Sequence, residues 1–195
     1  INGKEIDIDD YEYKNIIKRD WDYGTWKYNK RDIVEMSDGE IGCCLSHFYL
    51  WNKIIEEDYH ITLVLEDDAL RYNKEFISLT EHILQYAPNN WDIILLGFMI
   101  PHKARKNEKK IGNFYKVNQF FLTHSYLISL NGAKKLSHKT PINAPIDTWM
   151  SMQSNSVNIY RHDYIVTTKN LIKSNLVAQS DSISKSEIEH SNHAF

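Results

Sequence analysis

Three consecutive carboxylates, Glu66, Asp67 and Asp68, directly follow the short apolar run at residues 61–65. Adjacent like charges repel each other, and desolvating them is costly unless a cation or strong hydrogen-bond donors compensate. Hard oxygen ligands of this kind suit Mg²⁺ or Mn²⁺, which often bridge to substrate phosphates. The cluster therefore indicates metal-assisted chemistry on a phosphate-bearing substrate. The alternative is an acidic turn that only solvates the edge of the fold.

The apolar run at 61–65 is continuous and rich in β-branched residues, which is typical of a strand covered on both faces. WDIILLG at 91–97 has the same character, and Phe76, Thr80 and Ile83 give the intervening segment a helical spacing. Strand, helix and strand in succession predict a parallel crossover. Ligands of open α/β sheets bind outside the carboxyl ends of strands, which is where the carboxylates fall.

A helix is predicted to begin at SDGE, residues 37–40, because Ser37 and Glu40 have the spacing of a capping box. Apolar residues then recur at helical spacing to about Glu57. They are Ile41, Cys44, Leu45, Phe48, Trp51, Ile54 and Ile55.

The remaining segments are less regular. A short helix is expected within 9–32, a strand over 120–130, and a helix from about Gly132 to Ser137. The polar, basic stretch 101–113 has no apolar period and predicts a mobile loop. The proline-rich turn at 141–147 should deliver Asp147 to a third helix.

Composition favours one globular domain over residues 1–195, since 42% of the residues are hydrophobic and 25% are charged. A net charge of −3 without a basic stripe argues against nucleic-acid binding. No apolar run has the length of a transmembrane segment and the first residues do not resemble a signal peptide, so we expect a soluble domain, cytoplasmic or peripheral at a membrane face. The adjacent Cys43 and Cys44 fit neither a disulfide framework nor a zinc ribbon, and we interpret them as reduced core residues.

Several stretches, in order, resemble glycosyltransferase family 25, which includes lipooligosaccharide galactosyltransferases and collagen hydroxylysine galactosyltransferases. They are GEIGCCLSHFYLW (39–51), LVLEDDAL (63–70), WDIILLG (91–97), HSYLISLNGAKKL (124–136), APID (144–147) and, more weakly, AQSDSISKS (178–186). The resemblance covers the chain from about Asp38 to Ser184. It implies a GT-A-like α/β fold with a mostly parallel central sheet, which here would lack the family's first strand unit, ahead of Asn2. Either the sequence is truncated before this unit or this member has lost part of its donor site.

The same resemblance implies transfer of a hexose, usually galactose, from a UDP-sugar to a glycan or protein acceptor, with Mn²⁺ (or Mg²⁺) as cofactor. Glu66 and Asp68 look like an ExD version of the family's DxD-type signature, in which one carboxylate reaches the nucleotide and the other the metal. Asp68 is the favoured direct metal ligand and Glu66 a metal or donor ligand. Asp67 would either be a ligand itself or hold a neighbouring ligand in place at the donor site.

Asp147 resembles the acid of the family's PVD motif, and an inverting transfer needs a base for the acceptor hydroxyl. The alternative is a first-turn acid that answers the helix dipole. His47 matches the GCxxSH pattern and would hydrogen-bond the donor or the acid cluster. The alternative is a core histidine.

Three weaker predictions complete the site. Ser180 and Asp181 correspond to a late Ser-Asp pair that could approach the donor, unless they form a solvated tail. The basic stretch 101–113 could hold the anionic donor, although such runs are usually solvated surface. Trp21 and Trp26 could stack on an acceptor sugar or simply pack in the core.

The sequence thus predicts a metal-dependent inverting glycosyltransferase. The alternative is a catalytically degenerate domain of the same fold that binds a nucleotide sugar, a glycan or a partner without turnover.

Overall fold

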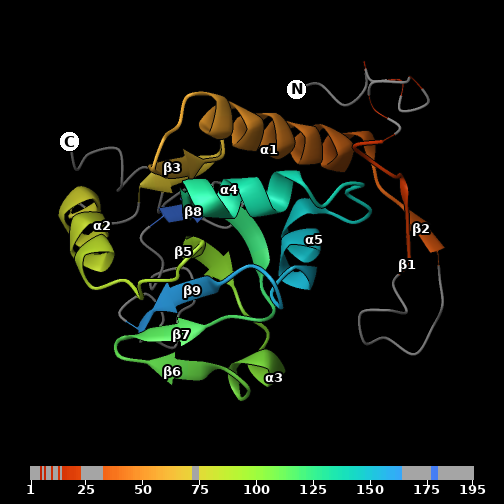
Figure 1. Ribbon diagram of the computed structural model, residues 1–195. Coiled ribbons are helices and arrows are strands. Elements are labelled where there is room, and N and C mark those ends of the chain that lie inside the picture. The colour runs from red at the N-terminus through yellow and green to blue at the C-terminus, as the bar shows by residue number, and fades with distance from the viewer. Residues whose placement is uncertain are drawn as a thin grey trace.

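The computed structural model describes residues 15–22, 33–71, 75–163 and 177–179, together with positions 5, 7, 10 and 13. Its centre is a six-stranded sheet in the order β3-β8-β5-β9-β7-β6 (Figure 1). The strands are β3 (Ile61–Leu65), β5 (Ile93–Met99), β6 (Lys109–Ile111), β7 (Phe114–Lys116), β8 (Phe121–Ser129) and β9 (Ile159–His162). Two-stranded pairs join β1 (Asp20–Asp22) to β2 (Ile33–Glu35) and β4 (Ala69–Arg71) to β10 (Val177–Gln179).

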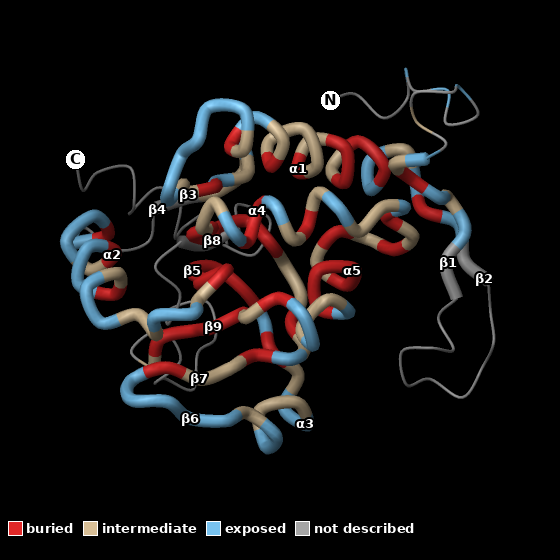
Figure 2. Tube along the Cα trace, in the orientation of Figure 1, coloured by how far each residue is buried: buried red, intermediate tan, exposed pale blue. Residues whose placement is uncertain are grey.

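The helices gather mainly at the β8 side of this sheet. In Figure 1, α1 (Asp38–Glu56) lies alongside α4 (Leu130–Ser137) and α5 (Ile146–Met152), and α4 and α5 both contact β8. The helix α2 (Phe76–Gln85) lies apart from them, and α3 (His102–Arg105) is a single turn. Figure 2 shows the buried core running through β5 and β9 and along the inner face of α1.

The α/β class is confirmed, but the expectation of a mostly parallel sheet is wrong. Only β5 and β9 pair in parallel within the described sheet, and its other four pairings are antiparallel. The strands β3 and β5 do run in the same direction, because both are antiparallel to β8. They are not neighbours, since β8, which comes later in the chain, lies between them.

The strand over 61–65 was also predicted to be covered on both faces, and this is wrong. β3 lies at an edge of the six-stranded sheet, and only Val64 is buried, whereas Ile61 and Leu65 are exposed. An apolar run alone does not distinguish an edge strand from a central one. By contrast, β5 is buried over six of its seven residues, as predicted.

One further segment differs from expectation, and another is described only in part. The stretch 101–113 is not an irregular loop, because it contains α3 and β6, and β6 pairs with β7 in a hairpin. Most of 9–32, where a short helix was predicted, lies outside the described residues, and those described form turns, a bridge at Ile17 and the strand β1. Among the described residues, no helix has both the length and the apolar composition that a membrane crossing requires.

Candidate functional site

The helix α1 begins where the capping box predicts. The Ser37 hydroxyl accepts a hydrogen bond from the Glu40 amide at 3.3 Å, and the Glu40 carboxylate accepts one from the Ser37 amide at 2.8 Å. These reciprocal bonds satisfy amides that have no partner inside the helix. Cys43 and His47 lie four residues apart on this helix and therefore share one face.

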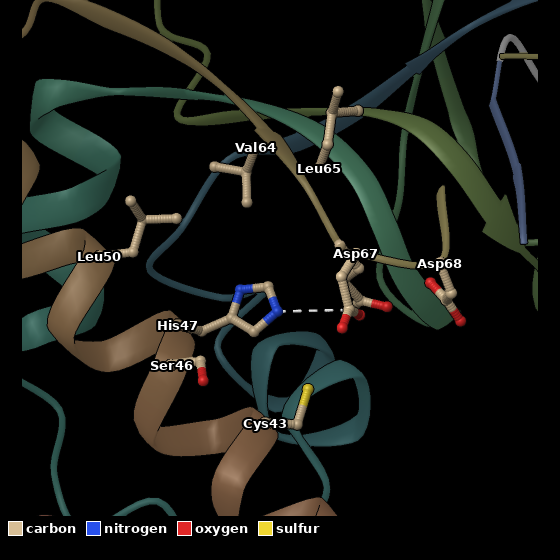
Figure 3. A pocket seen from close by; sticks show the side chains of 9 residues that line it. Cys43, Ser46, His47, Leu50, Val64, Leu65, Asp67 and Asp68 are labelled. Atoms are coloured by element: carbon tan, nitrogen blue, oxygen red, sulfur yellow. Dashed lines mark hydrogen bonds and ion pairs between the residues drawn. The ribbon is translucent and has the colours of Figure 1, made fainter. Parts of the chain in front are cut away.

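The carboxylates lie in the turn after β3, opposite that face. A pocket of about 450 Å³ separates the turn from α1, and its lining includes Cys43, His47, Glu66, Asp67 and Asp68. Figure 3 shows Cys43 and His47 extending from α1 toward the carboxylates. This size lies within the range of small-molecule sites. The structure therefore brings His47 together with the three predicted acids.

The side chain of His47 is only 5% exposed, and both of its ring nitrogens have hydrogen-bond partners. Nδ1 lies 2.7 Å from the Tyr126 hydroxyl, which also accepts a hydrogen bond from the indole N–H of Trp51 at 3.1 Å. Nε2 lies 3.3 Å from Oε1 of Glu66. A neutral imidazole that accepts from Tyr126 and donates to Glu66 satisfies all of these groups. His47 is thus a core residue and a partner of the acid cluster at once.

Glu66 receives a second hydrogen bond, from the Thr123 hydroxyl to Oε1 at 2.6 Å. Burial acts to raise the pKa of Glu66, but the hydrogen bonds from His47 and Thr123 outweigh it and hold the pKa below its ordinary value. The carboxylate is therefore ionised at neutral pH and fixed in place on the β8 side of the pocket.

Asp68 differs from its neighbours in having an unsatisfied oxygen. Its Oδ1 is buried and has no hydrogen-bond partner among the residues that the structure describes, while Asp67 is exposed. A buried carboxylate oxygen without a partner is costly unless something else compensates. A hard divalent cation fits this position, because Mn²⁺ and Mg²⁺ prefer carboxylate oxygens. The residues present thus fit the expected metal, with Asp68 better placed to hold it than Glu66.

Asp147 lies in the first turn of α5, as predicted, and its carboxylate accepts two backbone hydrogen bonds. Oδ2 accepts from the Leu122 amide at 2.9 Å, and Oδ1 accepts from the Thr148 amide. Leu122 has a positive φ of 67°, a conformation that is strained for a branched side chain. Asp147 therefore fixes the start of β8, next to Thr123, besides capping its own helix.

Cys43 is the residue that the sequence reasoning misplaced. Cys44 is buried in the core as expected, but Cys43 is only partly buried and lines the pocket. Burial raises the pKa of Cys43 to about 12, and the nearby carboxylates of Glu66, Asp147, Asp68 and Asp67 contribute. Its position one turn before His47 was the available signal. Tyr126 and Thr123 were missed as well, and only the strand pairing reveals them.

Other predicted residues lie elsewhere. Ser180, Asp181 and Trp26 are outside the described residues, as is the side chain of Trp21. The basic stretch 101–113 lies at the β6 edge of the sheet, opposite β3, and most of its residues are exposed, as expected of a solvated surface. A role for it in holding the donor stays a prediction.

Comparison with known proteins gives a family match over the part of the chain that contains the pocket residues. The sequence profile described as glycosyltransferase family 25 (LPS biosynthesis protein) matches residues 6–150. The chain is 31% identical to procollagen galactosyltransferase 1 of Danio rerio over 127 residues, which are 62% of this chain and 21% of the relative. It is 32% identical to procollagen galactosyltransferase 2 of Homo sapiens over 138 residues, and 34% identical to a glycosyltransferase 25 family member of Aedes aegypti over 137 residues. Each of these two matches covers 66% of this chain and 21% of the relative, so the chain spans about a fifth of the length of these relatives.

Proposed function

Because the chain belongs to glycosyltransferase family 25, we propose that it acts as a metal-dependent, inverting glycosyltransferase with a GT-A-like fold. The reaction moves a hexose from a UDP-sugar to a hydroxyl group of a glycan or protein acceptor. The names of two relatives, procollagen galactosyltransferases 1 and 2, support galactose as the hexose.

The observation that carries this proposal is the buried Oδ1 of Asp68, which has no hydrogen-bond partner among the described residues and belongs to a residue that lines the pocket with Glu66 and Asp67. Asp68 would hold Mn²⁺ (or Mg²⁺), with Glu66 and Asp67 toward the donor. Bound there, the cation supplies charge neutralisation for the departing nucleoside diphosphate.

The chain's own residues have separate tasks in this proposal. His47 and Thr123 hold Glu66 ionised and fixed in direction, so that it can accept hydrogen bonds from the donor. Asp147 accepts the proton of the attacking hydroxyl group of the acceptor. The adjacent residues Leu122 and Thr123 donate hydrogen bonds to Asp147 and Glu66 respectively, which supports a location of the two acids on the same side of the molecule.

Calorimetric titration of UDP and UDP-galactose into the purified chain, with and without Mn²⁺, tests the donor site. We expect metal-dependent binding that is lost in Asp68→Asn, which keeps the shape of the side chain but removes its charge. Asp58→Asn is the matched control, because Asp58 is exposed in the turn that follows α1 and Asn tolerates its positive φ of 54°. Binding that needs no metal, or that survives in Asp68→Asn, would overturn the metal-dependent donor site.

The second candidate is a degenerate domain that binds the nucleotide sugar without turnover. One observation favours it: both carboxylate oxygens of Asp147 already accept backbone hydrogen bonds, which is enough to explain the residue structurally. Slow release of UDP from UDP-galactose in the presence of Mn²⁺, without acceptor, separates the two. Metal-dependent binding with no hydrolysis and no transfer would support the second candidate.

A further inference from the structure

One group of side chains in the pocket combines three different donor atoms. A thiol sulfur of Cys43, a ring nitrogen of His47 and a carboxylate oxygen of Glu66 all lie within 4.8 Å of one another. Two come from successive turns of α1 and the third from the turn after β3 (Figure 3). The proposed donor site uses Glu66 and Asp68 but leaves Cys43 without a task.

The scaffold holds these donors rigidly. Cys43 and His47 project from the same face of α1, whose first turn is capped and whose inner face is buried. Glu66 is fixed by the Thr123 hydroxyl, and its backbone amide donates to the carbonyl of His124 at 3.1 Å. A set of donors that is already assembled binds a cation without a large ordering cost.

The donor chemistry selects the class of cation. Thiolate, imidazole and carboxylate together are the ligand types of Zn²⁺, whereas Mn²⁺ and Mg²⁺ favour oxygen alone. Catalytic and exchangeable zinc sites commonly have three protein ligands and keep the fourth position open. The neighbouring Asp67 and Asp68 carry only carboxylates, so the two groups of residues differ in the cations that they prefer.

The surroundings of His47 also suit a metal ligand. Such a histidine usually donates its second ring N–H to a fixed acceptor. The Tyr126 hydroxyl lies 2.7 Å from Nδ1 and can accept from it as well as from Trp51, because a hydroxyl oxygen has two lone pairs. Binding of a cation would therefore move the His47 proton from Nε2, where it bridges to Glu66, to Nδ1, and the Nε2 lone pair would take the cation.

We infer that Cys43, His47 and Glu66 form a binding site for a thiophilic divalent cation of the Zn²⁺ class, separate in its ligands from the carboxylate oxygen of Asp68. On binding, the Cys43 thiol loses its proton to solvent and a sulfur–metal bond forms, with no change of oxidation state. The fourth position faces the pocket and takes water. Occupation of this site replaces the hydrogen bond between His47 Nε2 and Glu66 with a bond from each of them to the cation.

The test is titration of the purified, phosphine-reduced chain with Co²⁺ alone, followed by near-ultraviolet and visible absorption. Co²⁺ bound to a thiolate gives a ligand-to-metal charge-transfer band, which binding to carboxylates does not produce. We expect this band at one equivalent of Co²⁺, and its loss when Zn²⁺ is added. Its absence from the wild-type chain would overturn the inference.

Variants locate the cation. Cys43→Ser should abolish the band, while Cys44→Ala should retain it, because Cys44 is buried in the core and hydrogen-bonds the carbonyl of Ala144. Asp68→Asn should retain the band too, and its loss there would place the cation on the acid cluster and contradict the separate site. Circular dichroism of each variant verifies folding. His47→Asn provides a second check, because it should weaken Co²⁺ binding while the chain stays folded. A band that persists in Cys43→Ser would also overturn the site.

Discussion

At the scale of single residues, the Tyr126 hydroxyl joins the core to the pocket. It is completely buried, and it bonds both the indole of Trp51 and the ring of His47. Burial raises the pKa of Tyr126 well above its ordinary range, so the phenol stays neutral and remains able to donate. The orientation of His47, and through it that of Glu66, depends on this one oxygen.

Tyr126→Phe should therefore destabilise the chain by about 1–3 kcal/mol, because it leaves a buried N–H and a buried ring nitrogen unsatisfied. The measurement is urea-induced unfolding. Tyr160→Phe is the matched control: its ring is equally buried, but its hydroxyl bonds the exposed Asn90, which water can satisfy. Equal losses in the two variants would show that the Tyr126 hydroxyl has no special role.

Asp147 has a structural task and a proposed catalytic one, and two substitutions separate them. Asp147→Ala removes both acceptors for the Leu122 and Thr148 amides and should cost about 1–3 kcal/mol of stability. Asp147→Asn keeps one acceptor oxygen and should cost less, yet it cannot take a proton from a hydroxyl group. We expect the Asn variant to lose transfer by about 10²- to 10⁴-fold in kcat while still binding UDP. Unchanged kcat in a folded Asn variant would exclude Asp147 as the base.

At the scale of elements, the packing of α4 against the sheet depends on a missing side chain. A Cβ atom at Gly132 would lie 2.5 Å from the backbone carbonyl oxygen of Asp92. Asp92 itself cannot move easily, because its fully buried carboxylate accepts hydrogen bonds from Asn131, Lys135 and Asn158. The close approach of helix and strand therefore requires glycine here.

Gly132→Ala should destabilise the chain even though alanine is the better helix former by about 1 kcal/mol. Overpacking against a fixed backbone atom costs about 1–3 kcal/mol and exceeds that gain. Gly39→Ala in α1 is the matched control, since its Cβ meets only the Ser37 hydroxyl at 4.0 Å, and it should be neutral or stabilising. Thermal unfolding of both variants is the measurement, and a stabilised Gly132→Ala would contradict the steric argument.

The contrast between α1 and the sheet shows which elements could be predicted. The bounds of α1 follow from its own residues, since Ser37 and Glu40 form a cap within four residues of each other. The sheet order depends on β8 entering between β3 and β5, which no local pattern in either strand encodes. Local signals therefore predicted α1, α2, α4, α5 and the buried β5, but not the short α3, and the long-range pairing gave the edge position of β3.

The same distinction applies to the site. The acids were predictable because they directly follow β3, and the position of Asp147 because a turn precedes its helix. The role of Tyr126 was not predictable, because Tyr126 lies next to His47 only through the register that pairs it with Val64 across β3 and β8. Thr123 reaches Glu66 through the same strand. Residues that support a site from a distant strand need the register, and the sequence alone does not supply it.

At the scale of the whole molecule, the candidate site and the most deeply buried ion pair among the described residues lie on opposite sides of the sheet. The site lies at β3 and β8, whereas Arg161 on β9 pairs with Glu108, just before β6. The Arg161 Nε lies 2.9 Å from Glu108, and the two side chains are only 6% and 4% exposed. The guanidinium also stacks over the ring of Tyr115 on β7, at 4.1 Å. This pair joins the outer hairpin to the central strands.

Glu108→Gln should lower the free energy of unfolding by about 3–5 kcal/mol, because it leaves the Arg161 charge buried without its partner. Asp163→Asn is the control on the same side of the sheet: it breaks the pair with Lys110 and a longer contact of 3.6 Å with His162, and solvent screening of this partly exposed carboxylate makes the expected loss much smaller. Because the site lies on the other side of the sheet, both variants should bind UDP with Mn²⁺ as the wild type does at temperatures where they remain folded. Calorimetric unfolding and UDP titration measure the two properties separately. Weakened UDP binding in a folded Glu108→Gln would mean that the two sides of the sheet are coupled. The carboxylate pocket would then depend on more of the fold than β3, β8 and α1.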